Sequence, residues 1–229
     1  MPEVWISKLF SLQDPEYKEF QSKLLPTLDP DSIIGIRNPK LRTFAREFAQ
    51  TKEASLFLST LPHSYYEENN LHMMLLAQIQ DFTPCLQMTE TFLPYIDNWA
   101  TCDLPAPACF GSHRKELLPS ITTWIHSHQT YTIRYGLGQL QRFYLEEDFS
   151  PLYLDLAATV ESDEYYVNMM LAWFFATALT KQWDATLPYL REHRLSPWVH
   201  KKTIQKAIES KRISPDHKEI LKNLRTLRV

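Results

Sequence analysis

Residues 167–179 read Val-Asn-Met-Met-Leu-Ala-Trp-Phe-Phe-Ala-Thr-Ala-Leu. Placed on a helix of 3.6 residues per turn, this segment is apolar around almost its whole circumference, whereas a surface helix has a polar side. The apolar run is shorter than the roughly 18 to 20 residues that a membrane span needs. We therefore expect a central helix of a helical protein, covered by other helices on several sides.

The glycines and prolines of the whole chain also favour helices. Only four glycines occur in 229 residues, where an average usage of about 7% gives roughly sixteen. So few glycines argue against turn-rich β folds and against glycine-rich phosphate loops. The fifteen prolines are spread along the chain, and three stand in the pairs Ser150-Pro151, Ser196-Pro197 and Ser214-Pro215. A capping residue followed by proline is typical of a helix start.

Apolar periodicity and these start signals predict about a dozen helices with short connections and no strand. The expected helices span residues 2–13, 15–25, 39–50, 52–61, 65–79, 83–96, 113–128, 131–146, 151–161, 164–180, 184–192, 197–210 and 215–228. Stacked in pairs, they predict an all-α fold, an α-solenoid of HEAT-like helical-hairpin repeats forming one domain over residues 1–229. A compact helical bundle is the alternative.

Cysteine usage and the N-terminus indicate a compartment. Cys85, Cys102 and Cys109 form an odd set without a Cys-x-x-Cys pair, which is typical of a reduced, cytosolic protein. The N-terminus lacks a basic segment followed by an apolar one, so we expect no signal peptide. We accordingly expect a cytoplasmic protein with no membrane partner.

Charge is unevenly distributed along the chain. The formal net charge is −3, yet residues 191–229 hold eleven Lys and Arg against four acidic residues. The basic candidates there are Lys202, Lys206, Lys211 and Arg212. Lys202 and Lys206 share one face of a predicted helix, and such a face can follow a phosphate backbone without reading sequence. A polyanion partner is one interpretation, and a solvated final pair of helices is the other.

The first candidate for chemistry is the segment Asp97–Asp103, just before a proline-rich joint at residues 104–107. If the segment is helical, Trp99 and Asp103 are i, i+4 neighbours, so an aromatic face stands beside a carboxylate. This pair suits the stabilisation of a cation, by charge and by the quadrupole of the ring. The alternative is a tryptophan at a helix joint, with Asp103 capping the next segment of the chain.

Trp173 and Arg134 form a second candidate set. Trp173 stands inside the apolar segment, and Arg134 stands among aromatic residues in Tyr131-Thr132-Ile133-Arg134-Tyr135. Arg134 could anchor a phosphate or pair with an acidic residue. Ordinary core packing is the alternative for Trp173.

A metal site is a weaker hypothesis. Cys109 and His113 are four residues apart, and His126 and His128 are two apart. Zinc ligands usually have tighter paired spacing, and no His-Glu-x-x-His motif occurs, so we expect no metal. No Ser-His-Asp or Cys-His arrangement can be assigned.

Five segments, in matching order along nearly the whole chain, together resemble the bacterial DNA alkylation repair proteins of the AlkD type. They are Gly35–Arg42 (GIRNPKLR), Asp97–Asp103 (DNWATCD), Ile133–Gly136 (IRYG), Tyr165–Trp173 (YYVNMMLAW) and Lys202–Ser210 (KTIQKAIES). No single segment is specific, but the set is.

The resemblance implies an α-solenoid whose concave, basic face holds duplex DNA, and a glycosylase that excises N3- or N7-alkylated purines without a base-flipping pocket. The family's two aromatic lesion contacts fall on Trp99 and Trp173, its catalytic aspartate on Asp103 and its phosphate-contacting arginine on Arg134. No cofactor is implied. Because an open groove must admit duplex DNA, we expect a monomer.

The chain departs from the family's pattern at several places. The first-repeat region is short, Ile133 stands where many relatives have a second basic residue, and residues 104–109 (LPAPAC) are rich in proline. Two alternatives to excision therefore stay open, namely DNA binding without catalysis and a protein-binding HEAT-type scaffold.

Overall fold

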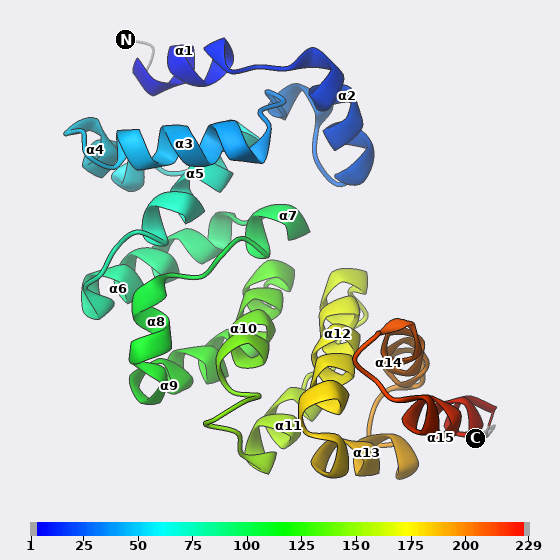
Figure 1. Ribbon diagram of the computed structural model, residues 1–229. Coiled ribbons are helices and arrows are strands. Elements are labelled where there is room, and N and C mark those ends of the chain that lie inside the picture. Colours follow the sequence, from blue (N-terminus) through cyan, green and yellow to red (C-terminus); the bar gives the residue numbers. More distant parts are fainter. Residues whose placement is uncertain (1–3, 227–229) are drawn as a thin grey trace. The chain divides into compact units, whose positions relative to one another are not determined.

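The structure is a computed structural model that describes residues 4–226. Within that range every regular element is helical, with no strand, and the helices follow one another as hairpins (Figure 1). The all-α, α-solenoid class predicted from periodicity is confirmed. The chain divides into two compact units, residues 1–114 and 115–229, and each is described separately.

The first unit contains eight α-helices within its described residues. They are α1 (Val4–Ser11), α2 (Pro15–Leu24), α3 (Asn38–Phe48), α4 (Glu53–Ser59), α5 (Tyr66–Leu76), α6 (Phe82–Phe92), α7 (Trp99–Cys102) and α8 (Ala108–Ser112). Two 3-10 turns, Pro30–Ser32 and Leu93–Tyr95, complete it. Sequence periodicity predicts no helix at α7 or α8, because four or five residues are too short to show a period.

The second unit continues the pattern. Its helices are α9 (Arg114–Ile125), α10 (Thr130–Phe143), α11 (Pro151–Ala158), α12 (Tyr165–Lys181), α13 (Trp183–Arg191), α14 (Pro197–Glu209) and α15 (Pro215–Thr226). The three expected serine caps are confirmed, since the hydroxyls of Ser150, Ser196 and Ser214 accept hydrogen bonds from backbone N–H groups two or three residues later. Residues 2–3 and 227–228, the ends of the first and last predicted helices, lie outside the described residues.

Helices α10, α12 and α14 of the second unit lie side by side as the second members of consecutive hairpins (Figure 1). Arg134 Nη1 donates to the Tyr166 carbonyl at 2.8 Å, and Gln141 Nε2 donates to Thr177 Oγ1 at 2.8 Å. Because both pairs keep the same order along the chain, α10 and α12 run parallel. Parallel second helices are what stacked helical hairpins produce.

Helix α12 is the central helix that residues 167–179 predict, with one difference. Its buried residues surround most of the helix and include Val167, Leu171, Phe174 and Phe175. Trp173, however, is 45% exposed. The interpretation of Trp173 as a core residue is therefore wrong, although the helix around it belongs to the core.

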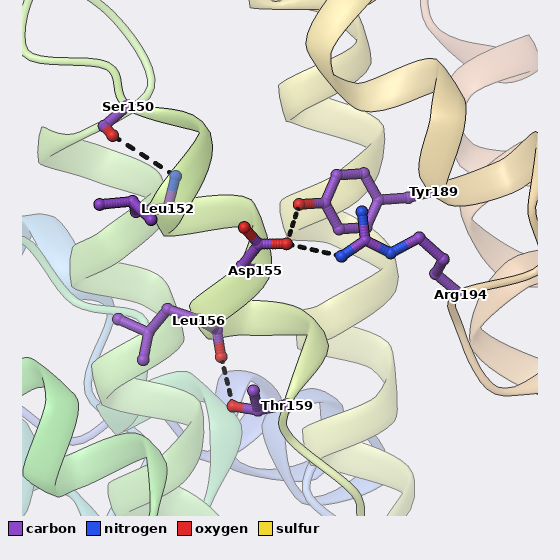
Figure 2. A network of polar contacts seen from close by, with 7 residues as sticks. All are labelled: Ser150, Leu152, Asp155, Leu156, Thr159, Tyr189 and Arg194. Carbon is purple, nitrogen blue, oxygen red and sulfur yellow. Dashed lines mark hydrogen bonds and ion pairs between the residues drawn. The ribbon is translucent and has the colours of Figure 1, made fainter.

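Helix α13 and the loop after it are tied to α11 by a polar cluster (Figure 2). Asp155 Oδ1 accepts hydrogen bonds from the Tyr189 hydroxyl and from Arg194 Nη2, both at 2.6 Å. The Arg194 guanidinium also lies 4.0 Å from the centre of the Tyr189 ring. The bond from Tyr189 and then that from Arg194 hold the pKa of Asp155 below its usual value, so the carboxylate stays charged at neutral pH.

In the first unit, helix α5 is buried on every side, polar residues included. The carboxylate of Glu67 accepts the backbone N–H groups of Ile34, Gly35 and Ile36 at 2.8, 2.7 and 3.1 Å. Burial raises the pKa of Glu67, and these three bonds oppose that effect. Gly35 has φ +92°, and a Cβ at this position would lie 2.5 Å from the Cβ of Lys18. Only glycine fits this turn.

Two histidines form a buried pair beside α5. His63 Nε2 and His72 Nδ1 lie 2.9 Å apart, His63 stacks on Phe57 and His72 stacks on Phe92. Burial lowers the pKa of His63 to about 4 and that of His72 to about 3. Both rings are therefore neutral in the folded protein at neutral pH.

The histidine pair predicts acid sensitivity. Below about pH 6.5 the histidines of the unfolded chain take up protons that the folded pair does not bind. The free energy of unfolding should therefore fall as the pH is lowered from about 6.5 to about 3. Urea unfolding across this range should show a smaller fall in a variant with both His63→Gln and His72→Gln. The exposed His128 supplies the control, and His128→Gln should leave the fall unchanged. A double variant as acid-sensitive as the parent would contradict the expectation.

No helix in the described part of the chain is long and apolar enough to cross a membrane.

Candidate nucleic-acid interface

The segment that carries Trp99 and Asp103 is a single helical turn, α7. Asn98 caps it, because its side-chain oxygen accepts the N–H of Thr101 at 2.8 Å. At the other end the backbone N–H of Asp103 bonds to the Trp99 carbonyl at 3.0 Å. Trp99 and Asp103 are thus held one turn apart, as the i, i+4 hypothesis requires.

The position of α7 is fixed by a buried polar side chain on α5, that of Asn70. The Thr101 hydroxyl donates to Asn70 Oδ1 at 2.7 Å and accepts from Asn98 Nδ2 at 3.0 Å. All three residues are buried. None of them is among the site residues predicted from sequence, although asparagine is one of the residues favoured at the N-cap of a helix.

Trp99 is half-buried, and a hydrogen bond at the edge of its ring holds the side chain in place. Its indole Nε1 donates to the Leu24 carbonyl at 3.2 Å, and its ring packs on a cluster of Leu25, Ile33 and Tyr66. Asp103 is also half-buried. The ring and the carboxylate are therefore both partly accessible on a rigid support, which a site acting on a cation requires.

The second unit brings three other predicted residues together. Trp173, Lys206 and Arg212 line one open pocket of about 360 Å³ between α12 and the end of α14. The hydroxyl side chains of Thr177, Thr180 and Ser210 and the carboxylate of Glu209 complete most of its wall. An accessible indole beside two cations suits a ligand with aromatic and anionic parts.

The remaining basic candidates occupy different surroundings. Lys202 lies one turn before Lys206 on α14, donates to Gln205 Oε1 at 2.9 Å and lies 5.7 Å from the centre of the Trp198 ring. Lys211 is exposed and is not among the residues lining that pocket. Arg134 is only 6% exposed and bonds to the Tyr166 carbonyl, so its guanidinium is held in a fixed position beside α12.

Two of the residues considered for a metal, His113 and His126, have ring nitrogens beside backbone carbonyl groups. His113 Nδ1 lies 2.9 Å from the Cys109 carbonyl oxygen, and its ring stacks on Phe82. His126 Nδ1 lies 2.7 Å from the Thr122 carbonyl oxygen. Residues 4–226 contain no group of three or more His, Cys, Asp or Glu side chains placed to hold a metal ion.

Comparison with known proteins assigns the chain to a family. A model of the family described as DNA alkylation repair enzyme matches residues 5–208. The chain belongs to this family. The matched range includes Trp99, Asp103, Arg134, Trp173 and Lys206, whereas Lys211 and Arg212 lie beyond it. No curated protein matches the chain.

Membership confirms the resemblance drawn from the five sequence segments and supports a role in DNA repair. The two groups of candidate residues fall in different units, Trp99 and Asp103 in the first and Arg134, Trp173, Lys202, Lys206, Lys211 and Arg212 in the second. Within its own unit, each group of residues has a defined arrangement.

Trp173 and its neighbour Phe174 offer a matched pair for testing exposure. Trp173→Ala removes a side chain that is 45% exposed, so the free energy of unfolding should fall by less than about 1 kcal/mol. Phe174 is fully buried, and Phe174→Ala should cost about 3 to 5 kcal/mol. Urea unfolding measures both. A comparable loss of unfolding free energy in the two variants would show that Trp173 is a core residue like Phe174.

Asn98 should connect helix capping with activity. Asn98→Ala removes the cap of α7 and should lower the free energy of unfolding by about 0.5 to 2 kcal/mol. It should also reduce DNA repair activity, because the candidate residues Trp99 and Asp103 lose their support.

Ser150→Ala is the matched control for this variant. It removes a cap of the same kind from α11, so it should cost similar stability and leave activity unchanged. Equal activity in the Asn98 and Ser150 variants would show that α7 holds its place without the Asn98 cap.

Proposed function

We propose that the protein is a DNA glycosylase that excises N3- or N7-alkylated purines from duplex DNA, as a monomer in the bacterial cytoplasm. The observation that carries this proposal is α7, a capped turn in a DNA alkylation repair protein that holds Trp99 and Asp103 one helical turn apart. No metal or cofactor takes part in the proposed reaction.

The chemistry suits a carboxylate. A purine alkylated at N3 or N7 carries a positive charge, and breaking its bond to C1′ returns the electron pair to the base, which leaves as a neutral molecule. The sugar is left with oxocarbenium character, which the charge of Asp103 would stabilise. Water then adds to C1′ and releases a proton, and Asp103 would orient that water. The products are a free base and an abasic site.

The aromatic and basic residues have binding roles in this proposal. Trp99 and Trp173 would contact the cationic nucleotide through their ring faces. Lys202, Lys206, Lys211 and Arg212 would neutralise phosphates, and Arg134 would contact a phosphate from its fixed position. Such contacts depend on charge and shape and not on base edges, so the base need not enter an enclosing pocket.

The experiment measures release of 7-methylguanine and 3-methyladenine from methylated duplex DNA. Asp103→Asn keeps the shape of the side chain and removes its charge, so release should fall by about a hundredfold or more while duplex binding persists. The exposed Asp81 in the same unit supplies the control, and Asp81→Asn should release both bases at the parent's rate.

The outcomes separate the candidate functions. Full release by Asp103→Asn would remove Asp103 from its catalytic role. Duplex binding by the parent without any release would assign a DNA-binding protein that lacks excision. Absence of both would favour a protein-binding scaffold.

A further inference from the structure

A pocket in the first unit is lined by none of the site residues predicted from sequence. It has a volume of about 470 Å³ and lies between α3 and α5. Arg42 and Arg46 lie on its α3 side, and Met74, Ala77 and Pro105 contribute apolar surface. Its chemistry is therefore cationic on one side and apolar over much of the rest.

The wall of this pocket is held in place by hydrogen bonds. Gln78, which lines it, donates from Nε2 to the Ala45 carbonyl at 3.3 Å and to the Met74 carbonyl at 3.0 Å. The same amide thus joins α3 to the end of α5. Because α5 is buried throughout, the pocket has a rigid base.

The two arginines carry charge that the described residues do not neutralise. They are exposed and stand four residues apart on one face of α3, where like charges repel. Arg46 Nη2 donates to the Thr43 hydroxyl at 3.2 Å, and neither arginine forms an ion pair within residues 4–226. An anion between the two guanidinium groups would remove the repulsion and accept their hydrogen bonds.

Pro105 connects the pocket with the proposed catalytic segment. It follows Asp103 by two residues, a distance of at most about 7 Å along the chain. One strand of B-form DNA advances by about 3.4 Å per nucleotide. A phosphate in the pocket would therefore lie within a few nucleotides of the sugar on which Asp103 is proposed to act.

We propose that Arg42 and Arg46 bind a backbone phosphodiester of the duplex beside the lesion, with the adjoining deoxyribose on the apolar surface of Met74 and Pro105. This inference rests on the proposed function and extends it. The basic contacts predicted from sequence all lie in the second unit, whereas this pocket gives the first unit a phosphate site of its own.

The salt dependence of duplex binding tests the site. Affinity for unmodified duplex DNA, measured by fluorescence anisotropy at several salt concentrations, gives a slope of log affinity against log salt of about 0.9 per phosphate contacted. The variant with both Arg42→Gln and Arg46→Gln should lose about one contact, so its slope should become shallower by about 0.9. Both side chains are exposed, so its melting temperature should match the parent's.

Two further variants serve as controls. Lys23→Gln removes an exposed cation of the same unit that already pairs with Glu19 at 2.8 Å, and it should keep the parent's slope. Replacing both arginines by lysine preserves the charges, so that variant should also keep the slope and thereby separate charge from packing.

The phosphate site and the glycosylase activity fail in different ways. An unchanged slope in the double glutamine variant, with base release by the parent, would overturn the phosphate site and leave the glycosylase standing. A shallower slope, with no base release by the parent, would support the site and overturn the glycosylase. A parent protein that does not bind duplex DNA would overturn both.

Discussion

The buried carboxylate of Glu67 is the interaction on which the first unit depends. An uncompensated carboxylate in the interior costs several kcal/mol, so it persists only where donors surround it. Here three consecutive N–H groups, those of residues 34–36, supply the donors, and the turn that presents them requires Gly35. The Glu67 carboxylate therefore fixes residues 34–36, the segment that leads into α3, against α5.

The other polar residues of α5 extend this constraint to the rest of the unit. Glu68 accepts the indole N–H of Trp5 at 3.0 Å and so attaches α1. Asn70 holds Thr101 of α7, and His72 pairs with His63. A single helix thus positions the N-terminal helix, the candidate catalytic turn and the base of the α3 pocket. Polar groups buried in this way specify one arrangement, because any other would leave them without partners.

The sequence predicts the helices well because proline, serine caps and apolar period act locally. Ser150-Pro151 and Ser196-Pro197 mark helix starts without any knowledge of the tertiary structure. Periodicity also identifies α12 as central, but it cannot tell which of its aromatic residues faces solvent. Trp173 and Phe174 are adjacent and similarly apolar, and only the packing of α10 and α14 against α12 distinguishes them.

The candidate site is predicted less completely, for a physical reason. Trp99 and Asp103 become candidates through their spacing together with the family resemblance. The buried polar side chains that support them belong to residue types that are mostly exposed in proteins, so a sequence-based interpretation places them on the surface. Asn70 and Asn98 are examples. Arg42 and Arg46 look like an ordinary solvated face of α3 until Met74 and Pro105, distant in sequence, are seen beside them.

Helix α5 has no surface that is free to vary. Each of its side chains contacts protein on some side, so a substitution there disturbs either the core or one of the segments that α5 holds. Change over evolutionary time would be tolerated more easily on the rows of α3, α12 and α14 whose side chains end in solvent. A lineage of such proteins can thus acquire new ligand preferences by altering these rows while the interior of α5 stays almost constant.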